Sequence, residues 1–184
     1  TYADKFIDAD GVIRNYNLAD YNIDAVNSGK FLFDLYDHSK DERYLKAIKQ
    51  LREQLKTHPR TSEGGFWHKK RYPHQMWLDG LYMGAPFYAQ YAQFFSEPEL
   101  FDDVIKQFLL VHKYTYNPET GLNYHGWDES RKQKWSNPET GCSPNYWGRA
   151  EGWYAMALVD VLDFIPENHT GRNKILEILK QVAA

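Results

Sequence analysis

Apolar residues recur at the spacing of α-helices along most of the 184-residue chain. Three segments are amphipathic, with apolar residues on one stripe and charged residues on the other face. They follow Ser39, Ser96 and Thr170, residue types that are typical of a helix start, and the first two segments have the form of a capping box. We predict that these three segments are outer helices whose charged faces lie in solvent.

Three other segments, 22–36, 75–95 and 149–164, are rich in aromatic and small residues and hold few charges beyond their first positions. A helix that is apolar on nearly all sides is usually buried. The pattern therefore predicts alternating inner and outer helices, three times over, with a period of about 55–70 residues. Asp24 and Asp79 each open a D-x4-G sequence, which is a faint echo of this repeat.

The remaining segments are predicted to be connections, since no stretch alternates for long enough to indicate a sheet. The longest, 116–147, holds two copies of N-P-E-T-G, at 117–121 and 137–141, and this sequence suits a type I turn. Repeated helical hairpins indicate either an open solenoid or a closed double ring of helices. We predict an all-α fold, with residues 1–184 as one domain.

Composition and charge exclude several classes of function, although they say little about the fold. Hydrophobic residues make up 42% and charged residues 26%, as in ordinary soluble domains, and no run is long enough to span a membrane. A net charge of −3 argues against a nucleic-acid surface. Cys142 is the single cysteine, which excludes an intrachain disulfide and a multi-cysteine zinc site. The aromatic content of 16%, with six Trp and fourteen Tyr, is typical of sugar-binding clefts and of wet protein interfaces.

Ionisable residues cluster where the inner segments begin. Asp24 opens the first segment, Asp79 lies near the start of the second, and Arg149 opens the third. If these starts share one end of a helical ring, the side chains converge on a central cleft. Enzymes that cleave glycosidic bonds usually hold two carboxyl groups in one pocket, one as the acid and the other as the base or nucleophile. The alternative is that both acids simply interact favourably with a helix N-terminus.

Two further groups combine cations with rings. His68 and Lys69 follow Trp67, and this group suits an anionic sugar or, alternatively, a turn with a hydrophobic anchor. Arg149 lies between Trp147 and Trp153, so its guanidinium either binds a carboxylate or takes part in ordinary aromatic packing. No nucleotide-binding glycine motif is present, and the histidines and acids lack the spacing of the HExxH metal motif.

Several motifs together resemble a known family. They are G-F-W-H-K at 65–69, Y-P-H-Q-M-W-L-D-G-L-Y-M at 72–83, W-G-R at 147–149 and G-W-Y-A-M-A-L-V-D at 152–160. These sequences resemble the unsaturated rhamnogalacturonyl hydrolases of glycoside hydrolase family 105, whose fold is shared by the unsaturated glucuronyl hydrolases. The resemblance implies an (α/α)6 barrel, a six-hairpin toroid, of which this chain holds about three hairpins from the central part.

The resemblance also implies the chemistry. The family acts on pectin-derived oligosaccharides that end in a 4,5-unsaturated uronic acid, and it hydrates the double bond to give an unstable hemiketal that releases the neighbouring sugar. Asp79 matches the general acid/base, which must hold a proton at the start of the reaction, and Asp24 matches the second acidic residue. The expected substrate-binding residues are His68, Lys69, Trp77, His125, Trp147, Arg149 and Trp153. No metal or organic cofactor is implied, because side chains alone can protonate and add water.

The expected partner is therefore a small oligosaccharide with an unsaturated uronate end, with no nucleic acid and no membrane. The family's common pattern implies a cytoplasmic enzyme. Two alternatives on the same toroid are an unsaturated glucuronyl hydrolase and a conventional inverting glycosidase that uses both acids. A third is a non-catalytic helical module that binds acidic glycans or a protein, because a fold alone does not fix a function.

Overall fold

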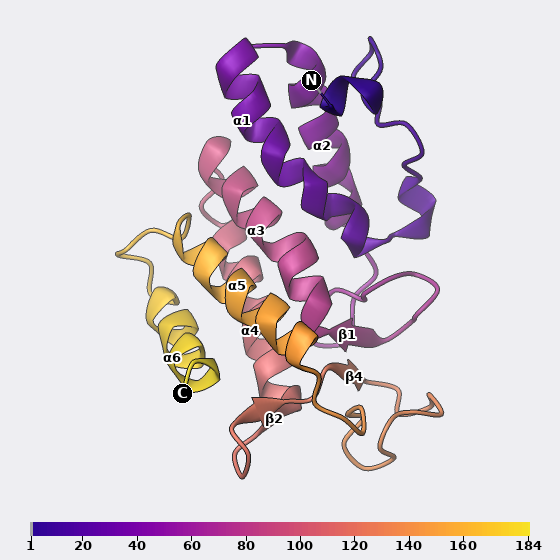
Figure 1. The fold of residues 1–184 in the computed structure, drawn as a ribbon, viewed down its shortest axis with the longest axis vertical. Helices are drawn as coiled ribbons and strands as arrows, with labels where there is room; N and C mark the ends of the chain where they lie inside the picture. Colours follow the sequence, from indigo (N-terminus) through magenta and orange to yellow (C-terminus); the bar gives the residue numbers. More distant parts are fainter. Residues whose placement is uncertain (1) are drawn as a thin grey trace.

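A computed structural model describes residues 2–184 of the chain. Its helices form three hairpins, in each of which an inner helix precedes an outer one (Figure 1). The bounds of the helices are α1 Lys30–Ser39, α2 Glu42–Thr57, α3 Leu78–Phe94, α4 Leu100–Thr115, α5 Gly148–Leu162 and α6 Arg172–Val182. Short 3-10 helices precede them: η1 Ala3–Lys5, η2 Leu18–Asp20 and η3 Ile23–Gly29.

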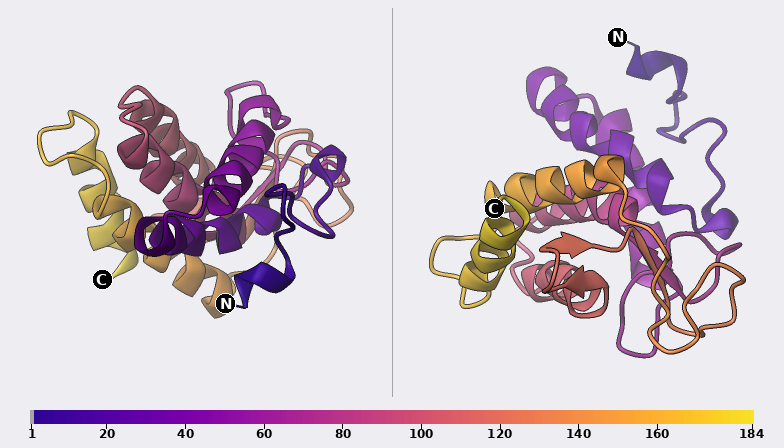
Figure 2. Two further views of the ribbon diagram at one scale, coloured as in Figure 1. Left: turned by 90° about the horizontal axis from the view of Figure 1, so that it is seen from above. Right: turned by 60° about the horizontal axis from the view of Figure 1, so that its bottom comes forward.

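The inner layer consists of η3 with α1, then α3, then α5. α3 lies in the middle, in contact with η3 on one side and α5 on the other, and each inner helix packs against its own outer helix (Figure 2). The predicted alternation of inner and outer helices is thereby confirmed. The first inner segment differs in detail, because it begins as the 3-10 helix η3 and becomes an α-helix only at Lys30.

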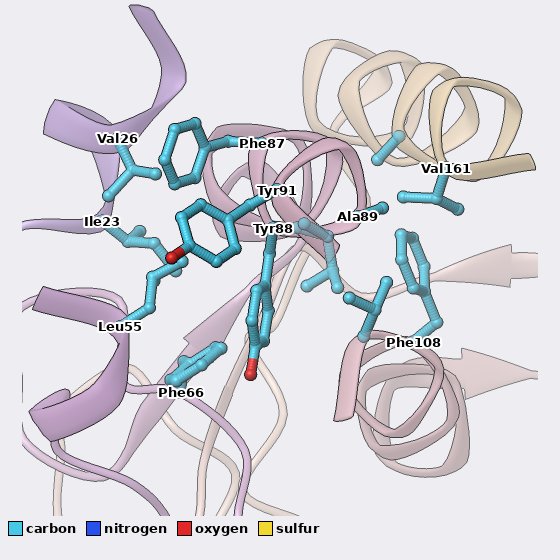
Figure 3. Close-up of a cluster of buried hydrophobic side chains, with 14 of the residues drawn as sticks. Ile23, Val26, Leu55, Phe66, Phe87, Tyr88, Ala89, Tyr91, Phe108 and Val161 are labelled. Carbon is cyan, nitrogen blue, oxygen red and sulfur yellow. The ribbon is translucent and has the colours of Figure 1, made fainter. Parts of the chain in front are cut away.

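The central helix α3 is buried on nearly all sides, as the absence of charged residues after Asp79 predicts. Phe87 and Tyr91 point toward Val26 of η3, while Ala89 lies on the side of the helix that faces Phe108 and Val161 (Figure 3). All six side chains are at most 6% exposed. One continuous core thus joins the three hairpins, and α3 connects its two halves.

The predicted capping boxes are wrong. Ser39 is the last residue of α1 and donates its hydroxyl to the Leu35 carbonyl at 2.6 Å. The cap of α2 is Asp41, whose side chain accepts a hydrogen bond from a first-turn amide. Ser96 adopts a positive φ of 56° after α3, and α4 begins only at Leu100 without a side-chain cap. Ser39 and Ser96 therefore lie where an inner helix ends, and the outer helices α2 and α4 begin three or four residues later, at Glu42 and Leu100.

Two very short ladders lie among the predicted connections. β1 Gln75–Trp77 pairs antiparallel with β4 Gly126–Asp128, and β2 Tyr116–Asn117 pairs with β3 Leu122–Asn123. Strands of two or three residues are too short to show alternation, so no pattern in the sequence predicts them. Both N-P-E-T-G copies form turns, in which the amides of Gly121 and Gly141 donate to Asn117 and Asn137 at 2.9 and 2.8 Å.

Candidate functional site

The three inner segments begin at the same end of the molecule, beside the β1–β4 ladder (Figure 1). Asp24 lies in the first turn of η3, Asp79 in the first turn of α3 and Arg149 in the first turn of α5. The ladder pairs Trp77 with Gly126, and the Leu78 amide donates to the His125 carbonyl at 3.1 Å. The starts of the inner segments thus share one end of the molecule, as the sequence predicts, and β4 adds the long connection to that end.

Asp24 is held by one cation, Lys69, and one imidazole ring, His68, from a distant part of the sequence. Its Oδ2 lies 2.6 Å from Lys69 Nζ, and its Oδ1 lies 3.4 Å from His68 Nε2. The backbone brings these residues together. The Ile23 amide donates to the His68 carbonyl at 3.2 Å, and the backbones of Asn22 and Lys69 form an antiparallel β-bridge. The Asp24 carboxylate thus has a fixed orientation before any ligand binds.

His68, which contacts the Asp24 carboxylate, is buried and only 4% exposed. Its ring stacks on Trp77, with centroids 4.3 Å apart, and its Nδ1 would be 2.9 Å from a Cβ at Gly80. Burial lowers the pKa of His68 to about 4, although the nearby Asp24 charge acts in the opposite direction. His68 is therefore neutral near pH 7, and its position suits it to orient Asp24 and Trp77.

A second group consists of His125, Trp147 and Arg149, and His125 links it to Asp79. The guanidinium of Arg149 lies 4.4 Å from the Trp147 ring, and His125 meets the same ring edge-on at 5.7 Å. Burial lowers the pKa of His125, while the negative charge of Asp79 favours its protonated form. Trp147 is 49% exposed, and Arg149 is exposed as well. Exposed Arg149 and Trp147 thus lie together with half-buried His125, which is close enough to Asp79 for its pKa to respond to the Asp79 charge.

Trp153 lies farther along α5, against a neighbour that the sequence analysis missed. Its ring is 4.6 Å from that of Tyr82, and Lys30 Nζ lies 3.8 Å above Tyr82 and 3.7 Å from Asp160 Oδ2. Tyr82 follows Asp79 by three residues, so helical spacing alone could have placed it on the same face. Lys30 was detectable as the cation that interrupts an otherwise aromatic segment.

The outer helix α2 supports the site through two buried polar side chains. Gln54 Nε2 donates to the Asn22 carbonyl at 2.9 Å, and its Oε1 accepts from the Tyr16 hydroxyl at 2.9 Å. His58, just beyond α2, places Nε2 2.7 Å from the Trp67 carbonyl and is also within 3.4 Å of Gln54. These bonds hold the two chain segments that carry Asp24 and His68, and no sequence motif indicated them.

All nine predicted site residues lie on or beside the starts of the inner helices, in three connected groups. Asp24 joins His68, Lys69 and Trp77, while Asp79 neighbours His125 with Trp147 and Arg149, and Trp153 lies deeper. Two carboxylates, one exposed cation and one exposed ring are suited to acid–base chemistry on an anionic sugar. Within residues 2–184, no three His, Cys, Asp or Glu side chains are grouped as metal ligands, and no helix is long and apolar enough to cross a membrane.

Comparisons with known proteins identify the family of the chain. A family model described as Glycosyl Hydrolase Family 88 matches residues 1–184. The unsaturated rhamnogalacturonyl hydrolase YesR of Bacillus subtilis (strain 168) is 30% identical over 154 residues, covering 80% of this chain and 43% of that protein. Protein Atu3128 of Agrobacterium fabrum is 48% identical over 86 residues, covering 47% of this chain and 36% of that protein.

Solved structures give the same fold. A family 105 glycoside hydrolase of C. acetobutylicum ATCC 824 matches with a TM-score of 0.96 at 51% identity, covering 97% of this chain and 50% of that chain. An α-1,6-mannanase, GH76A of Salegentibacter sp. HEL1_6, matches with a TM-score of 0.68 at 17% identity over 92% of this chain and 47% of that chain, which shows the fold alone. Residues 2–184 thus form three helical hairpins of an (α/α)6 barrel, and the chain spans half the length or less of these relatives.

Proposed function

Because the chain belongs to glycosyl hydrolase family 88, we propose that the complete protein removes an unsaturated uronic acid from the end of a galacturonyl-rhamnose oligosaccharide. The observation that carries this proposal is the pair of acids, Asp24 and Asp79, at the shared end of the inner helices with cations and rings around them. The likeness to the unsaturated rhamnogalacturonyl hydrolase YesR supports the choice of sugar.

In the proposed reaction, Asp79 is the general acid and then the general base. Its carboxyl proton goes to C4 of the 4,5 double bond, which leaves positive charge at C5 and a carboxylate at Asp79. Water then bonds to C5 and gives a proton back to Asp79, so one water is added in total. The resulting hemiketal opens and releases the neighbouring sugar. Asp24, fixed by Lys69 and His68, orients the substrate and the water.

We assign the uronate carboxylate to Arg149. Of the three cationic candidates, Lys69 already binds Asp24, and His68 is buried and neutral near pH 7. Arg149 is exposed, and its planar guanidinium can bind a carboxylate through two parallel hydrogen bonds. Trp147 beside it offers a ring face for the apolar side of the sugar.

The test measures the ultraviolet absorbance of the conjugated double bond in an unsaturated galacturonyl-rhamnose disaccharide, with the complete protein as enzyme. We expect wild-type protein to abolish the absorbance and Asp79→Asn to act about a hundredfold or more slowly, because asparagine cannot supply the proton. Asp163→Asn is the matched control, since Asp163 is an exposed acid at the opposite end of α5.

A parallel assay with an unsaturated glucuronyl substrate separates the related activities. Faster loss of absorbance with that substrate would replace the rhamnogalacturonyl assignment by a glucuronyl one. Unchanged absorbance with both substrates would refute hydration chemistry altogether, and would favour a conventional glycosidase or a glycan-binding module. Equal rates for Asp79→Asn and wild type would remove Asp79 from the centre of the reaction.

A further inference from the structure

A basic pocket adjoins the candidate site on the outer side of the Asp24–Lys69 ion pair. It has a volume of about 400 Å³, and its walls come from η2, the start of η3 and the loop before β1. The residues that line it are Ala19, Asp20, Asn22, Lys69, Lys70 and Arg71. Lys69 belongs to both places, since its Nζ binds Asp24. The pocket is therefore continuous with the site.

Positive charge predominates in this pocket. Three consecutive cations line it, against the single carboxylate of Asp20, which accepts a hydrogen bond from Asn17 Nδ2 at 3.0 Å. Lys70 and Arg71 are both exposed, and neither forms an ion pair with an acid in the described part of the chain. The Asp24 carboxylate balances the charge of Lys69, so Lys70 and Arg71 are the two cations that an anionic ligand can reach and that have no carboxylate partner within residues 2–184.

The backbone of the pocket is ordered by hydrogen bonds rather than being a loose loop. The Lys70 amide donates to the Asp20 carbonyl at 3.3 Å, and the Tyr72 amide closes a turn onto the Lys69 carbonyl at 2.9 Å. The Lys69–Asn22 bridge joins the same two segments. Lys70 and Arg71 therefore extend from a turn that is tied to the segment carrying Asp24, with Lys70 Nζ 5.8 Å from the Tyr21 ring and Arg71 Cζ 4.8 Å from the Tyr72 ring.

We propose that this pocket binds a second uronate carboxylate, in a longer oligosaccharide of the same substrate. The inference rests on the proposed function, under which the terminal unsaturated uronate lies at Asp79. A disaccharide holds a single carboxylate, whereas each added galacturonyl-rhamnose unit brings another. Lys70 and Arg71 supply the positive charge for that second carboxylate, so they set a preference for chain length rather than the reaction itself.

The test compares the complete wild-type protein with the double variant Lys70→Gln/Arg71→Gln. Substrates are the unsaturated disaccharide and the unsaturated tetrasaccharide with two galacturonyl-rhamnose units. We expect the variant to lose about threefold to tenfold in kcat/KM on the tetrasaccharide, through KM, because exposed charge pairs contribute modestly. On the disaccharide, kcat/KM is expected to stay within about twofold of wild type. Lys174→Gln/Lys180→Gln, which removes two exposed charges from α6, is the matched control.

If Lys70→Gln/Arg71→Gln changes kcat/KM equally on both substrates, or on neither, the pocket does not bind a second uronate carboxylate. The proposed function would stay intact in either case. If wild-type protein consumes neither substrate, the proposed function fails, and calorimetric binding of the tetrasaccharide decides the pocket separately. Weaker binding by the double variant than by wild type then supports the pocket. Equal binding by the two proteins, or no binding by wild type, rejects it.

Discussion

At the scale of single residues, the most perturbed groups near the site are two buried histidines. His58 is 3% and His68 is 4% exposed, and burial lowers the pKa of each to about 4. In His58 the hydrogen bond to the Trp67 carbonyl opposes this effect, and in His68 the Asp24 charge does so. Both rings are therefore neutral at pH 7, which suits residues that position others rather than carry charge.

These histidines predict how stability depends on pH. As pH falls from about 6.5 toward 4, the unfolded chain binds protons that the folded chain does not, so the free energy of unfolding decreases. Each histidine should remove roughly 2 kcal/mol between pH 7 and pH 5. Urea unfolding at several pH values measures this, and His58→Gln should flatten the dependence. His38→Gln, at an exposed histidine, is the control and should leave the pH dependence of the unfolding free energy as it is in wild type. The same pH dependence in His58→Gln as in wild type would contradict the burial argument.

At the scale of elements, two glycines explain how η3 packs so closely against α2 and α3. A Cβ at Gly84 of α3 would lie 2.7 Å from Ile23 Cδ1, and one at Gly29, at the end of η3, would lie 2.5 Å from Leu51 Cδ1. These are the glycines of the two D-x4-G sequences that Asp24 and Asp79 open. In both copies the acid faces the site, and the glycine allows close packing a little more than one turn later.

We therefore expect Gly29→Ala to destabilise the fold by about 1–3 kcal/mol through overpacking. The added methyl group would also lie 2.8 Å from two ring atoms of Phe87, which is fully buried and cannot move aside easily. Gly152→Ala is the matched control, because a Cβ there meets nothing within 4 Å in helix α5. Thermal unfolding should show the control to be neutral or more stable by up to about 1 kcal/mol. Equal melting temperatures for both variants would refute close packing at Gly29.

At the scale of the whole molecule, a partly buried ion pair joins the first hairpin to the second. Arg60, in the loop after α2, binds Asp103 of α4 through two bonds of 2.7 Å. Tyr88 of α3 donates to the same carboxylate at 3.1 Å, and Gln107 donates to it at 3.0 Å. Burial alone would raise the pKa of Asp103, but Arg60 outweighs it and lowers that pKa. The loop that leads to His68 is thus fixed to the central hairpin.

Breaking this pair should loosen the contact between the hairpins. We expect Asp103→Asn to cost about 1–3 kcal/mol of unfolding free energy, because Arg60 then keeps a partly buried charge without its counterion. Adding Arg60→Met should recover part of the loss in a double-mutant cycle, measured by urea unfolding. Asp37→Asn removes an exposed pair with Lys40 and should change stability much less than Asp103→Asn does. A loss at Asp103 no larger than at Asp37 would contradict the bridging role.

The candidate site was predictable in part from the sequence. Residues at the starts of the inner segments, such as Asp24, Asp79 and Arg149, stand out because they are ionisable groups at the boundary of apolar helices. Tyr82 and Lys30 were overlooked, although helical spacing and a lone cation marked them. Gln54 and His58 carried no signal at all, since a polar residue in an outer helix is ordinarily in solvent.

The sequence by itself determined the alternation of inner and outer helices, because hydrophobic periodicity reports burial along each segment. It also determined which residue types begin the inner helices, and its motifs indicated the family. Only the tertiary structure decided which distant side chains meet: Lys69 with Asp24, Trp77 with His68, and Tyr82 with Trp153. Such contacts depend on how helices and two- or three-residue strands pack in space. Local periodicity contains no information about that packing, which is why the site took shape only in the folded chain.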